Sequence, residues 1–269
     1  MRKRSFLLTL LATLACLSMV PAQAGQSCEP SELNPPDVAR AMELAYQSHQ
    51  ALDQSGAKVA LIARVGQDLS QYGVRYSHLA WVWRDHPQGR WLVVHELNRC
   101  ASAESGLFNE GLGNFFLDNM FAYEAKILIP SPATQERAVA MLASQQAFNL
   151  HWARYNMMAF PFSTTYQNSN QWVLESYAAL HSGSIGRENL QSWLKSQQYQ
   201  PDTINLSAAT RLGARMFRAN VAFDDHPFGR RMAGQIDTVT VESVLRFIKR
   251  REPDSRELIL QAKASQGLR

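Results

Sequence analysis

The sequence lacks the compositional biases of non-globular proteins. Glycine and proline contribute only 14 and 11 of the 269 residues, which excludes collagen-like and low-complexity chains. Hydrophobic residues make up 46% of the chain, so a wholly disordered protein is excluded as well. No block of like charges marks a nucleic-acid-binding tail. What remains is a globular chain long enough to bury a sizeable core.

Long apolar runs are absent except near the N-terminus. Basic residues at positions 2–4 precede an apolar run over residues 6–20, and small residues surround Ala24. This pattern predicts a secretory signal peptide over residues 1–24, and therefore a periplasmic protein with no membrane span after cleavage. An uncleaved anchor is one alternative, although the run is shorter than the roughly 20 residues that span a bilayer. A lipoprotein signal ending at Cys16 is the other.

Excess positive charge is also confined to the predicted signal peptide. Residues 2–4 carry three of the formal charges that make up the total of +4. The remaining +1 produces no large polycationic field that would argue for DNA or an anionic lipid as the target, and we expect no nucleic-acid partner.

Cysteine is scarce. Once Cys16 is removed with the signal peptide, Cys28 and Cys100 remain, and an even pair in an oxidising compartment predicts one disulfide. Its loop of about 70 residues would contribute roughly 4 kcal/mol in the chain-entropy model. The alternative makes Cys100 a nucleophile. No histidine and cysteine spacing is typical of a metal site, so we expect no metal and no cofactor.

The hydrophobic periodicity predicts one helix, then several strands, then more helices. The predicted strands cover residues 57–65, 78–83, 91–97 and 123–129. The predicted helices cover residues 37–52, 134–151, 168–180, 188–197, 208–217 and 241–249. The polar, glycine-containing residues 101–113 are predicted to form a long loop. This order indicates a single α+β domain over residues 25–269, with helices packed on an antiparallel sheet.

The two central strands predict a hairpin that carries two histidines. If its turn, residues 84–90, is symmetric, Val82 faces Trp91 and His78 faces His95. Because side chains alternate with period two, a slip of two residues would still leave both imidazoles on one face. Two imidazoles on an otherwise apolar face need hydrogen-bond partners or a functional role. Each histidine taken alone can instead be structural.

Ser169 stands where polar sequence changes to an apolar helical pattern at Trp172 and Val173. A hydroxyl at a helix start lies beside backbone N–H groups that have no intrahelical acceptor, and beside the positive end of the helix dipole. That environment suits a nucleophile and a developing oxyanion. The alternative is that Ser169 is simply the N-cap residue of the helix.

The order of these features resembles the circularly permuted papain-like fold. A histidine opens one strand (YSHLAWV), a polar residue lies on the next (WLVVHELN), and a nucleophile begins a later helix. The resemblance covers about residues 57–180, with a helical C-terminal extension over about residues 187–269. Relatives with this fold include NlpC-type cell-wall amidases and the lecithin:retinol acyltransferase group. The resemblance implies that His78 is the base, His95 orients it, and Ser169 replaces the family's cysteine.

A second resemblance covers nearly the whole chain after the predicted signal peptide. The segments HLAWVW, GLGNFFLD and YQNSNQWVLE resemble a family of secreted bacterial proteins, DUF2145, which is catalogued as a domain of unknown function. This resemblance implies no activity.

Two functions are consistent with these features. The first is an exported hydrolase or acyltransferase that acts on amide or ester bonds, with cell-wall peptides or acyl lipids as substrates. The second is a catalytically inactive envelope protein that binds a peptide, a lipid or a protein. Serine has no accessible anion at neutral pH, so the enzyme requires Ser169 Oγ within about 3.2 Å of a His78 nitrogen. A His78 ring turned away from Ser169 would favour the binding protein.

Other polar residues are expected to have ordinary roles. We expect Glu96 to be solvated or paired, Glu175 to be an unremarkable helix residue, and Asp225 and His226 to form part of a turn. The tryptophans at positions 81, 83, 91 and 172 are expected in the core; the alternative is that they line a groove for a lipid or a glycan.

Overall fold

A computed structural model describes residues 34–118 and 120–262. The predicted signal peptide and Cys28 lie outside the described residues. The helices are α2 (Pro35–Ser55), the 3-10 helix η2 (Ser70–Tyr72), α3 (Leu112–Leu117), α4 (Pro132–Leu142), α5 (Gln146–Asn149), α6 (Ser169–Ser182), α7 (Arg187–Ser196), α8 (Ala208–Phe217), α9 (Phe228–Met232) and α10 (Val241–Arg251). Among the residues described, no helix is both long and apolar enough to cross a membrane.

The strands form one large sheet and one small ribbon. They are β1 (Val59–Val65), β2 (His78–His86), β3 (Gly89–Asn98), β4 (Ser105–Gly111), β5 (Ala122–Ile129), β6 (Asp202–Asn205), β7 (Gln235–Thr238) and β8 (Arg256–Gln261). The large sheet has the order β4-β3-β2-β1-β5-β8, and each neighbouring pair is antiparallel. The α+β fold with an antiparallel sheet and packed helices is therefore confirmed.

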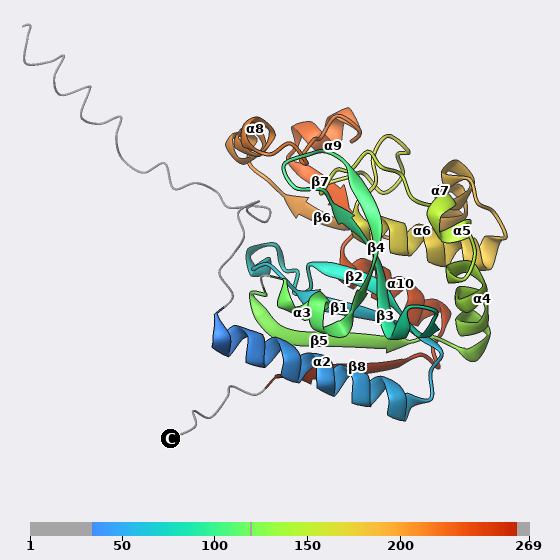
Figure 1. Cartoon of the computed structure of the whole chain (residues 1–269). Coiled ribbons are helices and arrows are strands. Elements are labelled where there is room, and N and C mark those ends of the chain that lie inside the picture. Colours follow the sequence, from blue (N-terminus) through green and yellow to red (C-terminus); the bar gives the residue numbers. More distant parts are fainter. Residues whose placement is uncertain (1–33, 119, 263–269) are drawn as a thin grey trace, which may run out of the picture.

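Helices cover both faces of the large sheet (Figure 1). Every residue of β1 is buried, and its side chains alternate between two cores. Ile62 belongs to the core that includes Leu44 of α2 and Phe115 of α3. Leu61 belongs to the core that includes Trp172 of α6, together with residues of α4, α7 and α10. A strand buried on both faces reads as a nearly continuous apolar run, as residues 59–65 do apart from Arg64.

The hairpin turn is tighter than the sequence predicts. Val82 pairs with Val93, and His86 pairs with Gly89, so the turn consists of Pro87 and Gln88 alone. The predicted opposition of Val82 to Trp91, and of His78 to His95, is therefore wrong by two residues. The strand pairing therefore includes residues that the sequence assigns to the turn, such as Asp85 and Arg90. Pro87 is compatible with this short turn because proline suits its second position and removes no hydrogen bond between the strands there. Both histidines nevertheless stay on one face, because the slip is even.

Two further predictions about regular structure are wrong. The predicted loop over residues 101–113 contains β4 and the start of α3, and β4 pairs with β3 along its whole length. An edge strand tolerates polar residues and glycine because one of its sides is open, so its composition resembles that of a loop. The predicted helical extension over residues 187–269 also contains strands, and β8 forms the other edge of the sheet beside β5.

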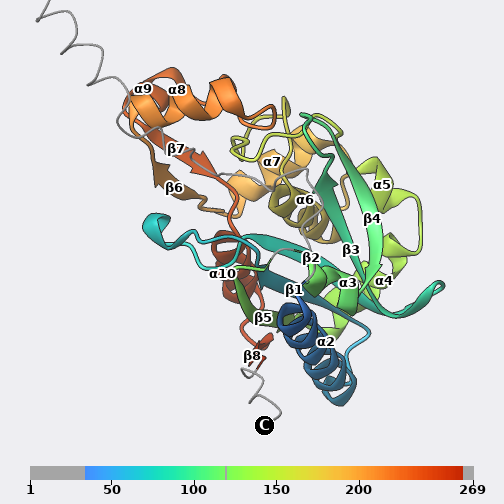
Figure 2. The ribbon, with the colours of Figure 1, turned by 60° about the vertical axis from the view of Figure 1, so that its left-hand side comes forward.

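The small ribbon of β6 and β7 lies with α8 and α9 at the end of the molecule away from α2 (Figure 2). Val221, Phe223 and Ile236 form its buried core, against which Ala214 of α8 packs. Gly234 precedes β7 with φ of +77°, and a Cβ atom there would approach the Leu206 carbonyl oxygen to 2.6 Å. Only glycine fits this close turn between α9 and the ribbon.

Candidate active site

The N-cap residue of α6 is Asn168. Its Oδ1 accepts a hydrogen bond from the backbone N–H of Gln171 at 2.8 Å. Ser169 is therefore the first residue inside the helix, and the alternative that Ser169 is the N-cap is wrong. Because Asn168 caps the helix, the Ser169 hydroxyl can contact a different partner.

That partner is His78. Ser169 Oγ lies 3.2 Å from His78 Nδ1, and His78 Nε2 lies 2.9 Å from His95 Nδ1. The structure thus brings together the three side chains that the sequence suggested, in a continuous series of hydrogen bonds. Ser169 and His78 remain 8% and 7% exposed, whereas His95 is 0% exposed. Of these three side chains, the hydroxyl and its base are therefore the ones nearer to solvent.

Side-chain bonds between β2 and α6 hold this geometry. The N–H of Leu79, next to His78, donates to Asn170 Oδ1 at 2.9 Å, and Asn170 follows Ser169 directly. Further along both elements, Trp81 Nε1 donates to Ser176 Oγ at 2.8 Å. Because each bond joins a residue of β2 to a residue of α6, the strand cannot slide along the helix without breaking both.

Glu110 extends the series and was not predicted. Its Oε2 lies 3.5 Å from His95 Nε2. Glu110 is on β4, opposite Val93, and is therefore a diagonal neighbour of His95 across the β3–β4 pair. The bond from His95 holds the pKa of Glu110 below its ordinary value. No signal in the sequence identified this residue, because its segment has the composition of a loop.

Burial keeps both imidazoles neutral at neutral pH. It lowers the pKa of His78 well below the ordinary value, with further contributions from Arg64 and His95. Burial also lowers the pKa of His95, although Glu110 opposes that effect. The nearby Arg64 side chain bonds to the Asp118 carboxylate and is 5% exposed. Neutral His78 has one unprotonated ring nitrogen, which is the form that a general base requires.

Two further buried titratable groups, Tyr155 and Glu96, belong to this region. Tyr155 is buried, which raises its pKa, while a hydrogen bond with Ser169 lowers it and the nearby Glu96 raises it. Glu96 is 0% exposed, so the expectation of a solvated or paired carboxylate is wrong. Neither oxygen of Glu96 has a hydrogen-bond partner among the described residues, and burial raises its pKa to about 8, although the nearby Ser105 lowers it.

Glu175 is also buried, contrary to the expectation of an unremarkable position. Arg187 binds both of its carboxylate oxygens, at 2.8 and 3.1 Å. Oε2 also accepts from Gln167, and Oε1 accepts from Gln171 and Gln191. This Glu175 cluster ties the segment before α6 and the helix α7 to the first turns of α6.

Other predicted features lie apart from the series. His226 binds the Asp225 carboxylate and the backbone carbonyl of Asp237, at 3.0 Å each, so this pair is part of the turn that leads to α9. The four tryptophans are buried as expected. Cys100 is disulfide-bonded; its predicted partner, Cys28, lies outside the described residues, so that pairing stays a prediction. Within residues 34–118 and 120–262, no group of acidic, histidine or cysteine side chains could hold a metal ion.

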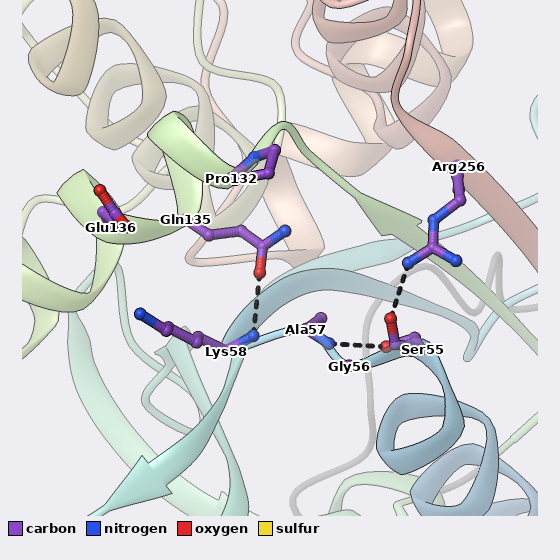
Figure 3. Close-up of a pocket in the computed structure, with 8 residues that line it drawn as sticks. All are labelled: Ser55, Gly56, Ala57, Lys58, Pro132, Gln135, Glu136 and Arg256. Atoms are coloured by element: carbon purple, nitrogen blue, oxygen red, sulfur yellow. Dashed lines mark hydrogen bonds between the residues drawn. The ribbon is translucent and has the colours of Figure 1, made fainter.

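A shallow cavity of about 210 Å³ lies elsewhere, between the end of α2 and the start of α4. In Figure 3, the Gln135 side chain reaches the backbone of Lys58, and Arg256 reaches the backbone of Ser55. These hydrogen bonds join α4 and β8 to the connection between α2 and β1, so the cavity is closed at its base by structural contacts.

Comparison with protein families accounts for most of the chain. The model of the family DUF2145, described as an uncharacterized protein conserved in bacteria, matches residues 51–248. The chain belongs to the DUF2145 family. The match includes every member of the hydrogen-bonded series, so this DUF2145 protein carries its candidate site inside the family region. Neither a curated protein nor a solved structure matches the chain.

Proposed function

We propose that this protein is an exported hydrolase or acyltransferase in which Ser169 is the nucleophile. One observation carries the proposal: Ser169, His78 and His95 are joined by hydrogen bonds, and the Glu110 carboxylate lies 3.5 Å from Nε2 of His95. A nucleophile, a base within hydrogen-bond distance of it, and a third group that orients the base are the three parts of a catalytic triad.

The series has a direction that follows from its carboxylate end. An ionised Glu110 can only accept, so we assign the proton of His95 to Nε2. His95 Nδ1 is then an acceptor for the Nε2 proton of His78. His78 Nδ1 is left without a proton and faces the Ser169 hydroxyl. Each link therefore sets the tautomer of the next, and the last link is a base aimed at Ser169.

The chemistry is acyl transfer in two steps. Ser169 Oγ forms a bond to the substrate carbonyl carbon while its proton moves to His78 Nδ1. That proton then passes to the departing amine or alcohol as its bond to the carbonyl carbon breaks, which leaves an ester on Ser169. Water, or an acceptor amine or alcohol, attacks this ester with His78 again as the base, and Ser169 is regenerated.

The start of α6 supplies stabilisation for the oxyanion. Asn168 accepts only the N–H of Gln171 with its side chain, and the N–H of Ser169 lies in the first turn, where no intrahelical acceptor exists. This N–H and the positive end of the helix dipole lie beside the atom that becomes bonded to the carbonyl carbon.

The expected substrates are amides of cell-wall peptides and, second, esters of acyl lipids. The resemblance of the motifs around His78, His95 and Ser169 to permuted papain-like amidases and acyltransferases supports these classes. The predicted signal peptide supports an envelope substrate, because it would deliver the protein to the periplasm.

A fluorophosphonate probe tests the nucleophile directly, because it phosphonylates only an activated serine. We expect the purified protein to be labelled at Ser169, and labelling to be lost in Ser169→Ala and in His78→Gln. Ser196→Ala changes an exposed serine on α7 and should leave labelling unchanged. Intact protein without a label at Ser169 would contradict the enzyme and favour the alternative, an envelope protein that binds its partner without catalysis.

A further inference from the structure

The helices α8 and α9 expose large apolar side chains. Leu212 and Met216 lie one turn apart on α8, and Phe228 and Met232 have the same spacing on α9. These four side chains, which we call the apolar patch, are between 61% and 70% exposed. Isolated exposed apolar residues are ordinary, but two helically spaced pairs on helices that lie together are not. Figures 1 and 2 both show α8 and α9 side by side at one end of the molecule.

The orientation of α8 shows that its apolar side faces outward. Ala214 packs against the small core of the β6–β7 ribbon. Leu212 and Met216 are each two positions from Ala214, about 200° around the helix, and so lie on the opposite side. An amphipathic helix on a globular protein normally turns its apolar stripe inward. The stripe of α8 is therefore available to something outside the chain.

The charge around the patch is positive. Residues 207–237 contain five arginines and three aspartates; Asp237 is paired with Arg230, and Asp225 is buried in its contact with His226, so the other four arginines outnumber Asp224. Arg215 is exposed and adjoins Met216. The Arg231 guanidinium lies 5.7 Å from the centre of the Phe228 ring. Apolar side chains bordered by arginines are the pattern of a helix that lies in the surface of an anionic membrane.

We propose that the apolar patch inserts into the surface of a bilayer that contains anionic lipids, with the neighbouring arginines at the level of the headgroups. A second copy of the chain fits less well, because a symmetric interface would bring two copies of the same arginine excess together with too little opposing charge. Anionic headgroups supply that opposing charge. The proposal does not depend on Ser169, so it goes beyond the proposed catalytic function.

Vesicle co-sedimentation tests this surface with the purified protein from residue 25 onward. We expect binding to vesicles of phosphatidylcholine with phosphatidylglycerol, weaker binding to phosphatidylcholine alone, and weaker binding as salt increases. The double variant Leu212→Ser and Phe228→Ser should lower the partition coefficient by about tenfold or more. Arg215→Gln should lower it by about fivefold on anionic vesicles, which corresponds to about 1 kcal/mol for one charge.

Two controls keep the test specific. Ile259→Ser changes an exposed apolar residue on β8, at the opposite end of the molecule from α8, and should bind like the unmodified protein. Ser169→Ala should also bind unchanged, which separates this surface from the catalytic proposal. Equal binding to both kinds of vesicle, or equal binding by the double variant and Ile259→Ser, overturns the proposal. A dimer in solution that the double variant abolishes, without vesicle binding, overturns it in favour of a second copy.

Discussion

Two buried polar clusters contact the first turns of α6, and they differ in how completely their hydrogen bonds are used. In the Glu175 cluster, both carboxylate oxygens accept from two or more donors, and the donors come from four different side chains. In the series from Glu110 to Ser169, both nitrogens of His78 and Nδ1 of His95 each have one hydrogen-bond partner, Nε2 of His95 has only the Glu110 carboxylate at 3.5 Å, and the last member is a hydroxyl.

The difference shows how a structural polar cluster can be told from a reactive one. A carboxylate surrounded by donors holds its charge in place and fixes the segments that supply the donors. A series in which each imidazole donates on one side and accepts on the other passes a preference for one proton position to its end. The first arrangement stabilises the start of α6, and the second activates a group on it.

The largest expected effect is on catalysis. His78→Gln removes the base but preserves a polar side chain, and His95→Phe removes the acceptor that fixes its tautomer. We expect each to lower kcat/KM by about 10³-fold or more, in line with the loss of a triad member. The measurement is hydrolysis of a generic ester and of a wall-derived peptide. Activity close to that of the unmodified protein in either variant would contradict the catalytic role of the series.

The Glu175 cluster should show the reverse pattern. Glu175→Ala removes a fully buried carboxylate and leaves the partly buried Arg187 without its partner, so we expect the free energy of unfolding to fall by about 3–5 kcal/mol. Glu188→Ala, on the exposed side of α7, should change it by less than about 0.5 kcal/mol. Denaturation in urea measures both. If Glu175→Ala were as stable as Glu188→Ala, the cluster would have no structural role.

Glu96 gives a smaller effect that depends on pH. Because its pKa in the folded protein is about 8, the folded state keeps a proton that the unfolded state loses above the ordinary pKa of 4.5. Stability from this group is therefore full below pH 4.5 and is lost as the pH rises towards 8, by about 1.4 kcal/mol per unit at most.

The variant Glu96→Gln removes this titration. We expect its free energy of unfolding, relative to that of the unmodified protein, to increase steadily when both are measured from pH 5 to pH 8. The reverse change at another site, Gln135→Glu, should not reproduce this pH dependence, because it adds a carboxyl group instead of removing one. A constant difference between the two proteins across this range would show that Glu96 is ionised in the folded state.

The smallest expected effect comes from Glu110, which acts on Ser169 through two imidazoles. Glu110→Gln keeps an acceptor for His95 but removes the negative charge, so we expect kcat/KM to fall by about tenfold with stability nearly unchanged. The pH dependence of kcat/KM in this variant should shift as well, because the negative charge of Glu110 no longer stabilises the protonated imidazole. A loss as large as that of His95→Phe would place Glu110 in direct contact with the substrate instead.

The sequence predicted most elements but not their alignment. The strands from β1 to β3 and β5 have strong alternation or continuous apolar runs, which periodicity detects. β4 was missed because an edge strand with Gly106 and Gly111 lacks that signal. The register of the hairpin was wrong by two because it depends on a ladder of bonds with neighbouring strands, which turn composition does not report.

The candidate site divides in the same way. Ser169, His78 and His95 could be singled out because a polar residue at a helix start, or an imidazole in an apolar strand, is conspicuous locally. Glu110 and the role of Asn168 as the N-cap could not, because their meaning depends on partners that lie in other elements.

The sequence by itself determined three things: the alternation of strand residues between two faces, the apolar run near the N-terminus, and the position of two histidines on one face of one hairpin. These properties follow from local periodicity, since side-chain direction repeats every two residues in a strand. Only the tertiary structure decided that Ser169 meets His78, that Glu110 completes the series, and that Leu212 and Met216 remain outside the core. Those outcomes depend on distances between segments far apart in the chain, which are fixed by the joint packing of sheet and helices and not by any one segment.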